Sequence, residues 1–197
     1  MIVMPDATID LVVEGALFAG FGTAGQRCTS MGTLWVHEKI YDQVKNAWVS
    51  TVENAIIGDP TKAVLYGPMI SEAYLNTHEK NLEMVQSHHK MLGSTSTGRI
   101  TAKNPRNNFL GDPDKGYFAH PTIVEGIVKS DALYHTETFG PLVGLGKFSD
   151  LDEAIDLANA HGYGLSSAIY TNDPKNVWKF REHVSSGMVS INNSTSG

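Results

Sequence analysis

Hydrophobic residues along the chain alternate between the spacing typical of strands and the spacing typical of helices. Strands are predicted over the short apolar runs at residues 2–4, 33–36, 117–124, 142–148, 165–170 and 188–191. Helices are predicted where apolar residues recur every three or four positions, over residues 9–21, 40–56, 71–91 and 151–158 and after residue 173. Because strands and helices alternate, the sequence predicts an α/β fold, with a mainly parallel sheet and helices on both faces.

Polar residues and prolines mark where several of these elements begin. Asp6 is expected to cap the first helix, and Asp150 with Glu153 has the spacing of a capping box. Asp173-Pro174 supplies a cap and a first-turn proline for the last helix. Residues 93–116 are rich in Gly, Ser, Thr, Asn and Pro, and they predict turns or a surface excursion.

Length and composition narrow the class of protein. The chain has 197 residues, 41% hydrophobic and 18% charged, so one domain with a sizeable core is expected. A net charge of -6 without a run of Lys and Arg argues against a nucleic-acid partner. No run of about 18 apolar residues and no signal-peptide pattern occur, so no membrane contact is expected. The single cysteine cannot form an internal disulfide, which makes the reducing cytoplasm the expected compartment.

That cysteine lies in a glycine-rich loop between a predicted helix and a predicted strand. The loop reads Gly22-Thr23-Ala24-Gly25-Gln26-Arg27-Cys28-Thr29-Ser30. Because glycine allows tight turns, the thiol of Cys28 can lie exposed beside free backbone N–H groups and Arg27, both of which favour the reactive thiolate. Cysteine is also common as a small buried hydrophobic residue, so the loop by itself leaves a reactive and an inert thiol both open.

Two further patterns carry less chemical information. Residues 20–25 read G-x-G-x-x-G, but a dinucleotide-binding loop needs a strand before it and a helix after it, and here the order is reversed. The eight histidines show no metal-ligand spacing. His88 and His89 would point about 100° apart on a helix. We therefore expect neither a dinucleotide loop at residues 20–25 nor a metal site.

Several short motifs follow one another along nearly the whole chain. They are Ile2-Val3-Met4-Pro5-Asp6-Ala7, Gly25-Gln26-Arg27-Cys28, Val36-His37-Glu38-Lys39-Ile40-Tyr41, Gly58-Asp59-Pro60, Gly67-Pro68, Gly116-Tyr117-Phe118, Pro121-Thr122, Glu137-Thr138-Phe139-Gly140-Pro141, Glu153-Ala154-Ile155, Ala158-Asn159 and Tyr163-Gly164-Leu165. Their order and spacing resemble the aldehyde dehydrogenase superfamily. The resemblance is specific because of the combination, although several pieces are weak alone.

The resemblance implies roles for three residues. Cys28 would attack an aldehyde carbonyl and carry a thiohemiacetal and then a thioester, while its backbone N–H helps to stabilise the oxyanion. Glu137 would bind the hydroxyls of the nicotinamide ribose of NAD or NADP, and Phe139 would pack against that end of the cofactor. Judged without the family, Glu137 is typical of a solvated carboxylate and Phe139 of a core residue. The implied reaction oxidises a small-molecule aldehyde to a carboxylic acid.

The resemblance also implies parts that this sequence does not contain. The family commonly has a basic residue where Thr33 stands, and a nucleotide-binding domain and a Glu-Leu-Gly-Gly motif ahead of the position of Met1. It continues beyond the position of Gly197 with a Pro-Phe-Gly-Gly loop and a tail strand that joins subunits. We therefore expect residues 1–197 to be a truncated C-terminal catalytic domain that binds cofactor weakly or not at all and self-associates through exposed edges. The alternative is a remnant without redox activity, at most a slow thiol-dependent esterase or a structural module.

Overall fold

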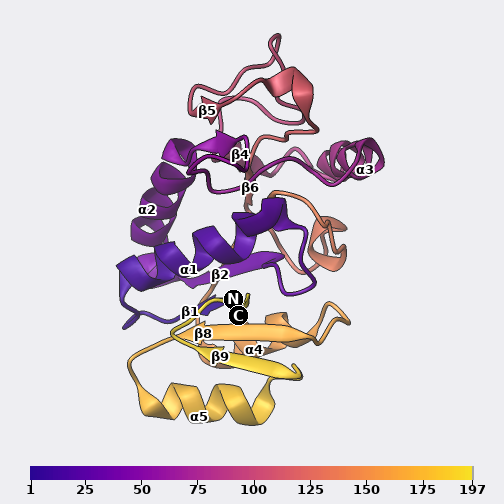
Figure 1. Ribbon diagram of the computed structural model, residues 1–197. Coiled ribbons are helices and arrows are strands. Elements are labelled where there is room, and N and C mark those ends of the chain that lie inside the picture. Colours follow the sequence, from indigo (N-terminus) through magenta and orange to yellow (C-terminus); the bar gives the residue numbers. More distant parts are fainter. Residues whose placement is uncertain (197) are drawn as a thin grey trace.

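A seven-stranded sheet forms the middle of the molecule (Figure 1). The computed structural model describes residues 1–196. The strands lie in the order β4 (Lys90–Leu92), β6 (Thr122–Glu125), β7 (Leu142–Phe148), β2 (Thr33–His37), β1 (Ile2–Val3), β8 (Ser166–Tyr170) and β9 (Met188–Ile191). Neighbouring strands are parallel, except that β4 is antiparallel to β6. The prediction of a mainly parallel sheet is confirmed.

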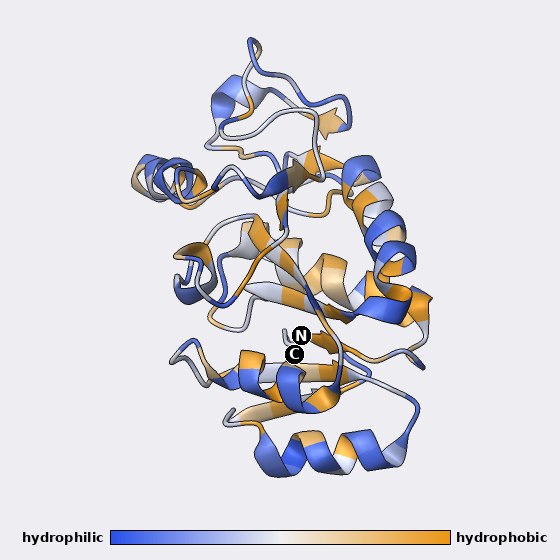
Figure 2. Cartoon of the chain, turned by 180° about the vertical axis from the view of Figure 1, so that it is seen from behind, coloured by the Kyte–Doolittle hydropathy of each residue, from blue (hydrophilic) through white to orange (hydrophobic). Residues whose placement is uncertain are grey.

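Helices cover both faces of the sheet, as the alternation of elements predicted. The helices α1 (Ile9–Phe21) and α2 (Tyr41–Asn54) share one buried cluster with Leu34 and Val36 of β2. The helices α4 (Leu151–Asn159) and α5 (Pro174–His183) share a second cluster with Trp35, because successive strand residues point to opposite faces. In Figure 2 hydrophobic colour follows the strands and polar colour gathers on the outer sides of the helices. Among residues 1–196, none of the helices combines the length and hydrophobicity needed to cross a bilayer.

Two of the three predicted helix caps are confirmed. Asp150 accepts a hydrogen bond from the Glu153 N–H at 3.0 Å, and Asp173 accepts one from the Lys175 N–H at 2.8 Å. The cap predicted at Asp6 is wrong, because α1 begins two residues later, with Thr8 at its N-cap position. The carboxylate of Asp6 instead accepts the Thr171 hydroxyl at 2.8 Å and so fastens the end of β1 to the end of β8.

The helix predicted over residues 71–91 is shorter than the periodicity indicated. Helix α3 (Glu72–Leu82) is followed by turns and then by strand β4. In β4, Met91 pairs with Val124 and Leu92 with Ile123 of β6, so backbone pairing at the sheet edge replaces the helix there. The adjacent strand is also shorter than predicted, since β6 begins at Thr122.

Residues 93–116 are only partly the surface excursion that their composition predicted. Strand β5 (Phe109–Leu110) pairs with β3 (Ile57–Gly58) in a second, two-stranded sheet, and Ile100 is buried in the main core. Arg106 is also buried, and its guanidinium donates to the carbonyl oxygens of Val52 at 2.7 Å and Ala55 at 3.0 Å. The segment therefore satisfies carbonyl groups at the C-terminal end of α2.

The Arg106→Leu variant is expected to lower the free energy of unfolding by about 2–5 kcal/mol, because it leaves buried carbonyl groups without donors. Urea denaturation followed by circular dichroism measures the change. Arg181→Leu is the control, since Arg181 is exposed on α5, where its guanidinium lies over the ring of Trp178 and makes no hydrogen bond or ion pair within the described residues. That variant should lose about 1 kcal/mol or less. Equal losses in the two variants would contradict the capping role.

Candidate active site

A cavity of about 390 Å³ lies at the amino-terminal ends of the parallel strands. Its walls come from the loops that lead into β2, β7 and β8, within residues 27–33, 136–140 and 161–167. In open parallel sheets, ligands usually bind beyond the carboxyl ends of the strands. This cavity is an exception to that rule, because the loops that line it come before strands β2, β7 and β8 and not after them.

Cys28 lines this cavity in a tight turn. Helix α1 is followed by the short helix η1 (Gly22–Gly25), and the turn then closes with the Ser30 N–H donating to the Arg27 carbonyl at 3.0 Å. The thiol of Cys28 is free and exposed. Within residues 1–196 its backbone N–H donates no hydrogen bond, so a free donor lies directly beside the sulfur. A free thiol and an unengaged backbone N–H are thus adjacent.

Gly25 brings the cysteine turn into direct contact with the segment before β7. Its φ of +67° lies in the left-handed region, and a Cβ atom built there would come within 2.2 Å of the Gly140 carbonyl oxygen. No side chain fits at that distance, so glycine is required both for backbone conformation and for space. The contact fixes the spacing between Cys28 and the residues that precede β7.

Glu137 and Phe139 line the same cavity as Cys28. The carboxylate of Glu137 is exposed and makes no hydrogen bond within the described part of the chain. Phe139 is partly buried and has a φ of +45°, a conformation that costs a non-glycine residue of the order of 1 kcal/mol. The structure therefore brings together the three side chains that the sequence singled out, although they lie far apart along the chain.

Arg27 lies in the cavity wall but is directed differently from what the sequence suggested. Its guanidinium sits 5.3 Å from the centre of the Phe18 ring on α1, a cation–π contact. The unengaged donor beside the thiol is therefore the backbone N–H of Cys28, whereas the Arg27 guanidinium is engaged with the Phe18 ring.

Sequence reasoning missed the side chains that hold the segment before β7. Asn81 on α3 donates to the Thr138 carbonyl at 3.0 Å, and Tyr163 accepts the Glu137 N–H at 3.2 Å. The motif Tyr163-Gly164-Leu165 drew attention to Tyr163, but it did not indicate that Tyr163 would contact Glu137. Nothing in the sequence predicted the contact between Asn81 and Thr138. The periodicity of residues 72–82 predicts a helix, but it does not show which segment that helix contacts.

His78 is a second contact from α3 that the sequence did not indicate. Its ring is fully buried and neither nitrogen has a hydrogen-bond partner among residues 1–196. A Cβ atom added to Gly140 would lie 2.7 Å from Nδ1 of this ring, so the imidazole packs directly on the Gly140 backbone. Burial lowers the pKa of His78 to about 4, because the charged ring would lose its hydration.

This lowered pKa predicts a loss of stability in mild acid. The unfolded chain takes up a proton at His78 below about pH 6.5. The folded chain resists protonation until about pH 4. Stability is therefore fully present above about pH 6.5 and is lost as the pH falls, by about 2 kcal/mol between about pH 7.5 and about pH 5. Urea unfolding at both pH values tests this, and His78→Leu should reduce the difference. An undiminished difference in that variant would assign it to other groups, such as His120, whose pKa burial also lowers.

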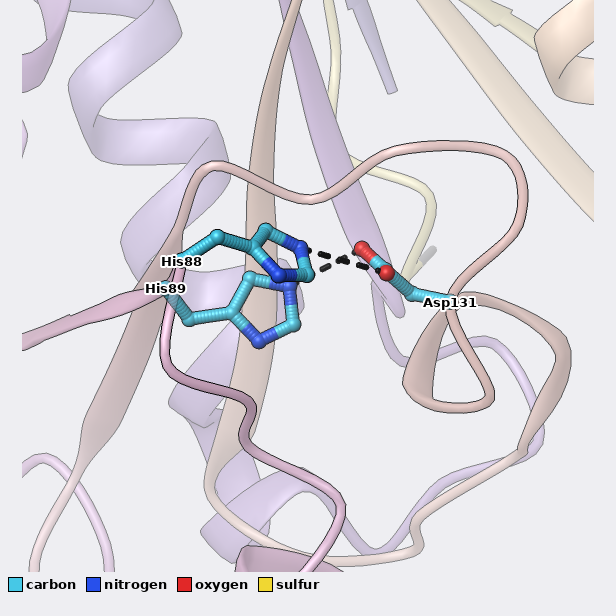
Figure 3. Close-up of side chains that lie close together, drawn as sticks. All are labelled: His88, His89 and Asp131. Atoms are coloured by element: carbon cyan, nitrogen blue, oxygen red, sulfur yellow. Dashed lines mark hydrogen bonds and ion pairs between the residues drawn. The ribbon is translucent and has the colours of Figure 1, made fainter.

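A cluster of His88, His89 and Asp131 lies beyond the carboxyl end of β6, away from the cavity (Figure 3). The expectation that the two histidines point apart was wrong, because they lie in a turn after α3 rather than on a helix. His89 Nε2 is 2.9 Å from one carboxylate oxygen of Asp131, and His88 Nε2 is 3.3 Å from the other.

The hydrogen bonds of this cluster favour a structural role over metal binding. Nδ1 of His89 accepts the Gln86 N–H at 3.0 Å, so Nε2 carries the proton that is donated to Asp131. In a metal-binding imidazole one ring nitrogen binds the metal and the other donates its N–H to a neighbouring group, whereas in His89 the nitrogen that faces away from Asp131 accepts a hydrogen bond. Burial alone would raise the pKa of Asp131, but hydrogen bonds from the Val128 N–H and from His89 outweigh it and hold the pKa below its usual value.

Comparisons with known proteins identify the family. The model of the aldehyde dehydrogenase family matches residues 1–197. Aldehyde dehydrogenase family 7 member A1 of Brassica napus is 35% identical over 201 residues, covering 100% of this chain and 38% of that protein. The 1-pyrroline-5-carboxylate dehydrogenase 2 of Bacillus subtilis is 32% identical over 198 residues, covering 100% of this chain and 36% of that protein.

Solved structures agree with this assignment. Betaine aldehyde dehydrogenase from Staphylococcus aureus, in complex with NAD+, superposes with a TM-score of 0.87 at 27% identity and covers 98% of this chain. The chain covers 36% of that structure, and so spans between a third and two fifths of the length of the relatives it matches. The family model covers residues 1–197 and so includes the segments that line the cavity. The chain belongs to the aldehyde dehydrogenase family.

Proposed function

We propose that residues 1–197 are the catalytic domain of an NAD(P)-dependent aldehyde dehydrogenase that oxidises an aldehyde to a carboxylic acid. The observation that carries this proposal is the convergence of Cys28, Glu137 and Phe139 on one cavity. A free thiol can serve as the nucleophile of covalent aldehyde chemistry, and an exposed carboxylate and an aromatic ring can bind a nicotinamide nucleotide beside it. A further structure of the betaine aldehyde dehydrogenase from Staphylococcus aureus holds a cysteine modified by β-mercaptoethanol, which supports a reactive thiol in a relative.

The first chemical step is assigned to Cys28. Its thiolate adds to the aldehyde carbon, a C–S bond forms, and the carbonyl π electrons move to oxygen to give a thiohemiacetal anion. The unengaged backbone N–H of Cys28 is available to donate to that oxygen. Loss of hydride from the thiohemiacetal carbon leaves a thioester on Cys28, and water then cleaves the C–S bond to release the acid.

The cavity fits the nicotinamide end of the cofactor. The exposed carboxylate of Glu137 can accept hydrogen bonds from two ribose hydroxyls, and the half-buried ring of Phe139 offers an apolar surface. When bound, NAD or NADP supplies the hydride acceptor for the reaction. Two other roles belong to residues of this chain. Glu137 orients the ribose of the cofactor, and Cys28 holds the carbon of the substrate.

We propose that another domain supplies most of the cofactor site. Glu137 and Phe139 contact only one end of the dinucleotide, so the 197-residue chain alone should bind NAD with millimolar or weaker affinity. Joined to a nucleotide-binding domain of the family, it should reduce NAD when an aldehyde is added. A spectrophotometric assay for NADH on both forms tests the proposal. Inactivity of the joined protein toward a broad panel of aldehydes would contradict it.

The surface of the chain supports the further proposal that it self-associates in isolation. Ile70 is 75% exposed and Trp178 is 59% exposed, and β9 is an edge strand of the sheet. Exposed apolar side chains and unpaired strand edges recruit partners. Because Cys28 is a free thiol, we also propose that the protein works in a reducing compartment, with the cytoplasm as the expected one.

A further inference from the structure

Few contacts within the described residues hold Glu137 in place. Within residues 1–196, the only hydrogen bond it makes is through its backbone N–H, which donates to the hydroxyl oxygen of Tyr163 at 3.2 Å. The carboxylate itself is exposed and has no ion-pair partner among these residues. The hydrogen bond that holds the Glu137 backbone therefore comes from a side chain in a distant loop.

Tyr163 is anchored well enough to serve as that support. Its backbone N–H donates to Nδ1 of His161 at 3.1 Å, and the two rings lie with their centres 5.7 Å apart. On the other side of Tyr163, the carbonyl of Gly164 accepts the Gly187 N–H at 2.8 Å. The loop is thus tied to the start of β9, and His161, Tyr163 and Gly164 all line the cavity.

Helix α3 holds the other half of the same segment. Asn81 donates to the Thr138 carbonyl, and His78 packs beneath Gly140. Between these contacts Phe139 keeps its left-handed φ, and such strain persists only where neighbouring contacts enforce it. The backbone from Thr138 to Gly140 is therefore fixed from one side by α3, which leaves Glu137 as the residue whose placement needs a second support.

We propose that Tyr163 is a positioning residue for Glu137: its hydroxyl oxygen holds the Glu137 backbone so that the carboxylate faces the ribose of the nicotinamide. This inference rests on the proposed function of Glu137 and adds the residue that orients it. Tyr163 acts through Glu137, so its removal should weaken the binding of a nicotinamide nucleotide while leaving the thiol of Cys28 as reactive as before.

The test compares Tyr163→Phe, which removes only the hydroxyl, with Tyr74→Phe. Tyr74 is a matched control, because both tyrosines are 48% exposed and Tyr74 makes no side-chain hydrogen bond within the described residues. The probe is nicotinamide mononucleotide, which carries the relevant ribose and lacks the adenosine. Its affinity is measured by ligand-observed NMR, and the rate of iodoacetamide labelling of Cys28 is measured alongside. Tyr163→Phe should weaken the affinity about 5- to 10-fold, the effect of one neutral hydrogen bond, and leave the labelling rate unchanged. Tyr74→Phe should change neither.

A double-mutant cycle with Glu137→Gln separates positioning from a purely structural effect. Glu137→Gln should itself weaken nicotinamide mononucleotide, and adding Tyr163→Phe should then cost little more, because the oriented group is already lost. If Glu137→Gln weakens the probe and Tyr163→Phe does not, or if the two effects multiply in full, the inference is overturned and the proposed function stands. If Glu137→Gln has no effect on the binding of the probe, the proposed role of Glu137 is overturned and the inference falls with it.

Discussion

The Cys28→Ser variant is expected to lose at least about 10³-fold in the rate at which p-nitrophenyl acetate acylates the 197-residue chain. A thiol is nucleophilic as its thiolate, whereas a serine hydroxyl needs a neighbouring base to remove its proton. Within residues 1–196 no side chain hydrogen-bonds the thiol of Cys28, so a serine placed there would have no such base. The release of p-nitrophenolate, followed by absorbance, gives the rate.

Glu137→Gln is the control for this experiment. It changes a residue in the same cavity, but one assigned to the cofactor rather than to the acyl group. Its acylation rate should stay within about twofold of the parent chain, since no cofactor takes part. Acylation that survives Cys28→Ser undiminished would show that another group on the surface reacts with the ester.

The Gly25→Ala variant is expected to lower the acylation of Cys28 by about 10²-fold and to destabilise the chain. The added methyl group would lie 2.2 Å from the Gly140 carbonyl oxygen, and the residue would have to keep a φ of +67°. Either the cysteine turn or the segment before β7 must move, and a shift of about 1 Å at a reacting group costs about that factor. Acylation kinetics and thermal unfolding, measured on the same sample, check both effects.

Gly32→Ala offers a matched control from the same loop. Among residues 1–196 no atom lies within 4 Å of a Cβ built at Gly32, and the φ of Gly32 is not in the left-handed region. This variant should acylate at nearly the parent rate. Comparable losses at Gly25 and Gly32 would mean that the loop tolerates no substitution at all, and the specific contact with Gly140 would then explain nothing.

Much of the fold could be predicted because it depends on local patterns. The strand over residues 142–148 is observed as predicted, since its apolar run is buried on both faces of a parallel sheet. The capping residues Asp150 and Asp173 act on backbone groups two or three residues away, so the sequence alone identifies them. The G-x-G-x-x-G pattern at residues 20–25 begins in the last two residues of α1 and continues through η1, and the next strand is β2, so a helix precedes it and a strand follows it, as the flanking periodicity predicted.

The remainder depends on contacts between distant segments. The stretch Lys90–Leu92 became a strand because β6 was available to pair with it, which its own residues do not encode. Arg106 is buried because carbonyl groups at the end of α2 accept from it, and composition placed it in a surface excursion.

The candidate site divides in the same way. The resemblance of its motifs to the family pointed to Cys28, Glu137 and Phe139, and these three residues line one cavity. Their supports could not be predicted, because Tyr163, Asn81 and His78 act on backbone atoms of a segment far from them in sequence. Every residue type has similar backbone groups, so the type of a residue does not show which side chain will contact its backbone. Such contacts are therefore seen only in the folded structure.

We propose that Cys28 is a nucleophile in the folded chain. The most direct measurement is mass spectrometric peptide mapping after brief exposure of the native chain to p-nitrophenyl acetate and an acid quench. We expect an acetyl group on the peptide that contains Cys28, and no acetyl group there when the chain is first treated with iodoacetamide. An unmodified Cys28 in the native chain, with modification only after denaturation, would contradict the claim and identify the thiol as inert.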